Sequence, residues 1–136
     1  MTPGRLDGRW CYCLPADPAR DLRDLHTLLT SPDTGWRVRY RHSTPTVEQV
    51  GEDLFGDDVA AQWSVFRQRD DVFRGWVHVG SANLLDGVAH LSLASTERSR
   101  GWGTFLEAAA HCIDDVFIKL PLRKLYSEML TENLGQ

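Results

Sequence analysis

The sequence predicts an α+β domain in which one mixed β-sheet carries helices on both faces. Between 61 and 94, apolar and polar residues alternate in consecutive runs joined by short polar turns, which favours antiparallel strands. From 88 to 130 the pattern changes to strand, long amphipathic helix, strand. A connection of that length joins parallel strands by a right-handed crossover. The sheet is therefore expected to be antiparallel at its start and parallel at its end.

The first half of the chain is expected to contain one strand and two helices. Residues 10–14 alternate aromatic and aliphatic side chains with two cysteines, as a short strand does. Asp17-Pro18 is an N-cap followed by a first-turn proline, and leucines at helical spacing extend that helix over 18–30. Thr44-Pro45 opens a second helix, 44–55. Between the helices, 36–41 is extended, with arginines on one side that form either a solvated face or a contact to an anionic ligand.

The second half continues with a hairpin and the crossover unit. Strands at 61–69 and 72–82 are joined by Asp70-Asp71, and a third strand occupies 88–94. A helix over 101–117 then leads to a last strand at 122–130. The apolar stripe of that helix is expected to consist of Phe105, Ala109, Cys112, Ile113, Val116 and Phe117.

Length and composition restrict the classes of function. A chain of 136 residues is one domain, 1–136, and its net charge of −4 argues against a nucleic-acid-binding surface. We expect no membrane span, because no apolar run is long enough, and no leader peptide at the N-terminus. Three cysteines fit reduced thiols and a cytoplasmic location, and they are too sparse for a metal site. Arginines supply 13 of the 15 basic residues, a bias typical of GC-rich bacterial coding sequences.

The most informative stretch lies between the strand at 88–94 and the helix that follows it. It reads Glu97-Arg98-Ser99-Arg100-Gly101-Trp102-Gly103-Thr104. Glycines let the backbone approach a ligand, and the free N–H groups and dipole of a helix start attract anions. This turn is either a phosphate site, assisted by its two arginines, or only a tight turn. The signatures of a P-loop and of a dinucleotide-binding fold are both missing from the sequence.

This motif, in this order of elements, resembles the GNAT superfamily of N-acyltransferases. The family signature is Arg or Gln, two residues, Gly, one residue, then Gly or Ala, and 98–103 match it at each defined position. Residues 75–79, 89–94 and 122–128 are similar to the third, fourth and fifth strands of the family. Asn133 falls where the family carries an Asn after the fifth strand.

The resemblance implies acetyl-CoA or another acyl-CoA as donor and a small-molecule or peptide amine as acceptor. It places the pyrophosphate on the N–H groups of Arg98 to Thr104 and the pantetheine along the backbone of Leu93 and Ala94. It also implies that backbone N–H groups at 93–95 stabilise the oxyanion. For the proton of the amine, the pairs Tyr126 and Glu128, and His90 and Ser92, each share a strand face. No residue pattern chooses among these four side chains, and water is a further route for the proton.

One difference from the family bears on catalysis. The family continues past the position of Asn133 with a helix and two strands that complete the acceptor pocket, whereas this sequence ends at Gln136. We therefore expect either an N-acetyltransferase or a catalytically silent CoA-binding module that acts with a partner chain. The strand at 122–130 would be an open edge, which predicts a homodimer or a partner that completes the fold.

Overall fold

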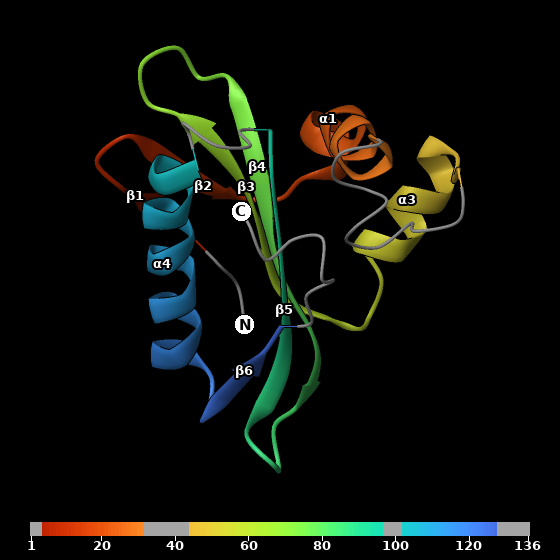
Figure 1. The fold of residues 1–136 in the computed structure, drawn as a ribbon. Coiled ribbons are helices and arrows are strands. Elements are labelled where there is room, and N and C mark those ends of the chain that lie inside the picture. Colours follow the sequence, from red (N-terminus) through yellow and green to blue (C-terminus); the bar gives the residue numbers. More distant parts are fainter. Residues whose placement is uncertain (1–3, 32–43, 97–101, 128–136) are drawn as a thin grey trace.

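The computed structural model describes residues 4–31, 44–96 and 102–127, which form one six-stranded sheet and three helices (Figure 1). The strands are β1 (Leu6–Asp7), β2 (Cys11–Pro15), β3 (Val59–Arg67), β4 (Phe73–Asn83), β5 (Val88–Ser95) and β6 (Lys124–Tyr126). The helices are α1 (Pro18–Thr30), α3 (Val47–Leu54) and α4 (Trp102–Lys119). The predicted extended segment 36–41 lies outside the described residues.

The order of strands across the sheet follows the order of the chain, from β1 to β6. Neighbours from β1 to β5 pair antiparallel, as in the match of Val77 with Leu93. β6 runs parallel to β5, with Leu125 beside Ala89, because α4 carries the chain back to the other end of the sheet. α4 covers one face, and α1 and α3 cover the other (Figure 1). The predicted mixed sheet with helices on both faces is confirmed.

Local capping explains where the helices begin. The carboxylate of Asp17 accepts the N–H of Ala19 at 3.0 Å, and Pro18 occupies the first turn of α1. α3 starts at Val47 rather than at 44, because Thr46 and Gln49 form a reciprocal capping box.

Two separate apolar cores hold the helices to the sheet. The core under α4 contains Trp63, Val65, Val77, Val79, Phe105, Ala108, Ala109, Cys112 and Val116, among others. The core under α1 and α3 contains Leu25, Leu28, Leu29, Val50, Leu54, Trp76 and Ala94. The predicted stripe of α4 is wrong at Phe117, which is 38% exposed, and it omits the buried Ala108. Position 117 lies 100° around the helix from the buried Val116, which turns its side chain to the flank.

The return from α4 to β6 is fixed by the turn between β4 and β5. Gly87 lies in this turn with a φ of +70°. Its carbonyl oxygen accepts hydrogen bonds from the backbone N–H groups of Arg123 and Lys124, at 2.7 and 3.1 Å. The Arg123 side chain donates from Nε to the Asp86 carbonyl at 2.9 Å. β6 therefore starts at Lys124, two residues later than predicted, and the end of the predicted strand, 128–130, lies outside the described residues.

Candidate active site

The first turn of α4 is anchored at the edge where β4 begins and β5 ends. Phe105 is buried against Gly75 so closely that a Cβ on Gly75 would lie 2.4 Å from the ring. The same Cβ would lie 2.5 Å from the Ala94 carbonyl oxygen. Only glycine fits between the helix and the two strands. The start of α4 is therefore fixed beside the last residues of β5.

Backbone N–H groups are the donors that the start of a helix offers to an anion. The first N–H groups of a helix have no partner within it, and the helix dipole adds partial positive charge there. A Cβ added at Gly103 would meet no described atom within 4 Å, so packing does not require glycine at that position. The Thr104 side chain hydrogen-bonds the buried Cys11 thiol of β2.

Positive charge gathers at the same edge of the sheet. Burial lowers the pKa of the half-buried Arg74, and the neighbouring charges of Arg67 and Arg69 lower it further. The backbone carbonyl of Arg74 accepts the N–H of Thr96 at 2.9 Å, which places this residue beside the end of β5. Asp70 opposes this shift and forms a salt bridge with Arg67, so the positive charge at this edge is partly neutralised.

β5 extends beyond its described pairing with β6. The described parallel pairs end with His90 beside Tyr126, whereas β5 continues to Ser95. Along that extension, Leu93 packs with the core under α4 and Ala94 with the core under α1 and α3. Both residues are also held by β4 on the other side, through Val77 and Trp76.

Three of the four candidates for the proton of the amine lie on one face of the sheet. His90, Ser92 and Tyr126 share the face covered by α1 and α3, as their pairing with β4 and with each other requires. The rings of His90 and Tyr126 have centroids 6.0 Å apart. Glu128, the fourth candidate, lies outside the described residues.

Solved acetyltransferases share this architecture over almost the whole chain. A GNAT-family acetyltransferase from Bacillus anthracis aligns with a TM-score of 0.71 at 12% identity, over 97% of this chain and 77% of that one. RimL, a ribosomal-protein alpha-N acetyltransferase in complex with coenzyme A, gives 0.74 at 12% identity over 94% and 75%. Spermidine N-acetyltransferase from Vibrio cholerae, in complex with CoA and spermine, gives 0.74 at 16% identity over 93% and 75%. The chain has the GNAT fold.

No protein-family model and no curated protein matches the sequence, so the likeness is one of structure. Within the GNAT fold, the described residues of the predicted donor site are Leu93 and Ala94 on β5 and Trp102, Gly103 and Thr104 on α4. The other predicted donor residues, Arg98, Ser99, Arg100, Gly101 and Asn133, lie outside the described residues. No group of three potential ligands in 4–31, 44–96 and 102–127 could hold a metal ion, and the cysteines there are free thiols. None of the described helices is long and apolar enough to cross a membrane.

His78 is a further residue on the face of the candidate acceptor side chains, and it was not among the predicted site residues. His78 lies on β4 directly opposite Ser92, is 6% exposed, and has its ring centroid 5.1 Å from that of Trp76. The sequence could have indicated this position, because Trp76 and His78 alternate with two valines, and alternation places the two rings together on the face opposite the valines.

Proposed function

We propose that this chain transfers an acetyl or another acyl group from acyl-CoA to a primary amine of a small molecule or a protein N-terminus. The main support is the anchoring of α4 beside the end of β5 by Phe105 and Gly75. The solved structures that share the fold of this chain are acetyltransferases, and two of them were solved with CoA bound. The free cysteines fit the proposed cytoplasmic location.

The proposed donor site follows the edge between β5 and α4. The N–H groups of residues 98–104 would bind the pyrophosphate, with the charge of Arg74 nearby. The backbone of Leu93 and Ala94 would pair with the pantetheine, and Asn133 would contribute from beyond β6. Acyl-CoA supplies the activated thioester, and N–H groups at 93–95 would stabilise the oxyanion that forms on its carbonyl.

The acceptor would approach from the face that carries His90, Ser92 and Tyr126. An amine must lose a proton to attack, and these groups, with Glu128, are the candidates that receive it directly or through water. His90 and Tyr126 are both exposed and lie where the described β5–β6 pairing ends, which favours them over the half-buried Ser92.

A second function, a CoA-binding module that works with a second chain, has its own supporting observation. Leu106 and Phe117, on the flank of α4 away from β1 and β2, are 39% and 38% exposed. Below that flank, Leu91 on β5 and Leu125 on β6 are only partly buried. A homodimer or a partner chain would cover this apolar surface, and light scattering at micromolar concentration would detect the dimer.

Binding of the donor is tested by thermal unfolding with acetyl-CoA. At one hundred times its dissociation constant, acetyl-CoA should add about 2.7 kcal/mol to the free energy of unfolding. Gly103→Asp places a carboxylate at the helix start and should abolish this gain. Gly4→Asp is the matched control, because a Cβ at Gly4 also meets no atom within 4 Å. Equal gains in both variants would contradict the proposed site.

Turnover separates the two functions. An acetyltransferase should release CoA in the presence of a primary amine at about 1–10³ per second. A module should bind acetyl-CoA with the same thermal shift and release none until its partner is added. The absence of both binding and turnover would contradict both proposals.

A further inference from the structure

Three rings form a row across β4, β5 and β6 on the face covered by α1 and α3. Gly80 of β4 lies opposite His90 of β5, which lies beside Tyr126 of β6. The ring of His78 leans over Gly80, since a Cβ on that glycine would lie 2.7 Å from His78 Cε1. The missing side chain at Gly80 is what gives this ring room toward His90.

The row is anchored at one end and open at the other. At the β4 end, Trp76 contacts His78 and donates from Nε1 to Gln62 Oε1 at 2.8 Å. Gln62 in turn donates from Nε2 to the Leu54 carbonyl at 2.7 Å. At the β6 end, Tyr126 is 46% exposed and His90 is also exposed. A ligand can therefore reach the ring faces of Tyr126 and His90, while the rest of the row is held by the core.

The charged side chains on these three strands disfavour a substrate with more than one positive charge. None of the described residues of β4, β5 or β6 is Asp or Glu, whereas Lys124 lies on the same face two residues before Tyr126. A substrate with a second ammonium group would meet repulsion from Lys124. The described strands themselves carry no carboxylate, and that of Asp58, beside β4, already accepts from Ser81 Oγ at 3.2 Å. An uncharged flat group would instead gain contact area with the two rings.

We propose that the acceptor is an amine attached by a short alkyl linker to an uncharged aromatic ring, which stacks on Tyr126 and His90. This inference rests on the proposed acyl transfer and names its substrate class. Ser92 lies two residues along β5 from His90, about 7 Å toward the proposed thioester. With its ring at Tyr126, an arylalkylamine would direct its nitrogen along β5 toward that position.

The test compares three probes: 2-phenylethylamine, 2-cyclohexylethylamine of similar shape without aromaticity, and spermidine. We expect kcat/KM to be about three- to tenfold higher for the aromatic amine than for the cyclohexyl amine, and lowest for spermidine. Equal values for the two ring amines, or a preference for spermidine, would overturn the inference.

Variants separate stacking from catalysis. Tyr126→Leu should raise KM about three- to tenfold more for 2-phenylethylamine than for 2-cyclohexylethylamine, and Tyr126→Phe should keep the preference for the aromatic amine. Trp10→Leu is the control, because Trp10 is also an exposed aromatic residue but lies in the turn before β2. An equal rise in KM for both ring amines in Tyr126→Leu, or the loss of the aromatic preference in Tyr126→Phe, would overturn the stacking role.

A binding measurement distinguishes this inference from the proposed reaction. Titration of 2-phenylethylamine should shift the NMR signals of the His90 and Tyr126 rings in the wild type. Such shifts without turnover would support the ring site and contradict the reaction. Turnover without shifts and without aromatic preference would support the reaction and overturn the ring site.

Discussion

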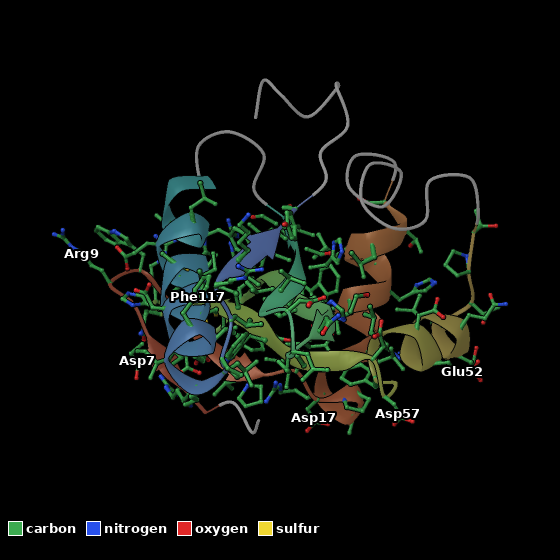
Figure 2. All side chains as sticks on the ribbon, turned by 90° about the horizontal axis from the view of Figure 1, so that it is seen from below. Asp7, Arg9, Asp17, Glu52, Asp57 and Phe117 are labelled. Atoms are coloured by element: carbon green, nitrogen blue, oxygen red, sulfur yellow. The ribbon has the colours of Figure 1, made fainter. Side chains whose placement is uncertain are left out.

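The two faces of the sheet are held to their helices by different chemistry. Under α4 the core is apolar apart from the thiols of Cys11, Cys13 and Cys112 and the indole nitrogen of Trp63. Polar side chains of α4 lie beside this core, among them Thr104, which hydrogen-bonds Cys11, and Glu107, which accepts the backbone N–H of Arg9. Under α1 and α3 an apolar core is combined with buried polar groups. Figure 2, which views the sheet from its end, separates α4 on one side from α1 and α3 on the other.

One cluster of buried polar groups under α1 centres on Asp21. The fully buried carboxylate of Asp21 accepts from Ser64 Oγ at 2.8 Å and from the backbone N–H of Asp17 at 2.9 Å. Arg20 completes this cluster through a salt bridge to Asp21 at 2.5 Å. Networks of this kind specify one arrangement of the layers, because any displacement leaves a buried group without its partner.

The comparison indicates a division of roles. The apolar face fixes α4 and with it the proposed donor site, whereas the polar face continues into the row of His78, His90 and Tyr126. Close packing stabilises without selecting a ligand, and directional polar groups can select one. Substitutions on the two faces should therefore have different effects on stability and on ligand binding.

The largest effect is expected from Phe105→Ala on the α4 face. Removing this buried ring from Gly75 should lower the free energy of unfolding by about 3–5 kcal/mol and weaken acetyl-CoA binding, because the start of α4 loses its anchor. Phe117→Ala is the matched control and should cost much less, since Phe117 is partly exposed on the same helix. Urea unfolding measures both, and equal losses would contradict the anchoring role.

An intermediate effect is expected from Gln62→Leu on the polar face. It leaves the Trp76 N–H and the Leu54 carbonyl without their partner, which should cost about 1–3 kcal/mol of stability. Gln68→Leu is the control, within about 0.5 kcal/mol of the wild type, because Gln68 is exposed. A near-neutral result for Gln62→Leu in urea would show that this network adds no stability.

The smallest effect concerns pH and the thiols under α4. Contact with Cys13 and burial raise the pKa of Cys112, so the folded chain keeps this proton while the unfolded chain loses it above about pH 8.5. The contribution of this thiol to the free energy of unfolding is therefore fully present below about pH 8.5 and decreases as the pH rises above it. The wild type should lose more free energy of unfolding between pH 7.5 and pH 10 than Cys112→Ala. Parallel losses in both proteins would assign the alkaline sensitivity to other groups.

The sequence predicts most elements because their signals are local, but it misses the two-residue strand β1, which is too short to carry a period. Asp17-Pro18 marks the start of α1, and the run around His78 and the helix beginning near Trp102 carry clear periods. These signals, with the rule for crossovers, also determine the order and direction of the strands. The family resemblance adds the GNAT fold, which the solved acetyltransferases support.

The sequence could not predict contacts that depend on how the layers meet. The periodicity of α4 assigns Phe117 to the apolar stripe. The way the helix lies on the sheet instead leaves Phe117 partly exposed and buries Ala108. The ring row depends on the register that places Gly80 opposite His90, which no local pattern contains. The roles of residues 98–101, Glu128 and Asn133 stay predictions.

The contact between α4 and the N-terminal turn links the two ends of the chain during folding. Glu107 on α4 accepts the backbone N–H of Arg9, 98 residues earlier, and Figure 2 shows Arg9 beyond α4, away from α1 and α3. Cys13 also donates to the Ala108 carbonyl, 95 residues away. Closing so long a loop is slow compared with pairing consecutive strands. The α4 face of β2 therefore stays uncovered until α4 has formed, and trimming the first ten residues would act on the helix that starts at the proposed donor site.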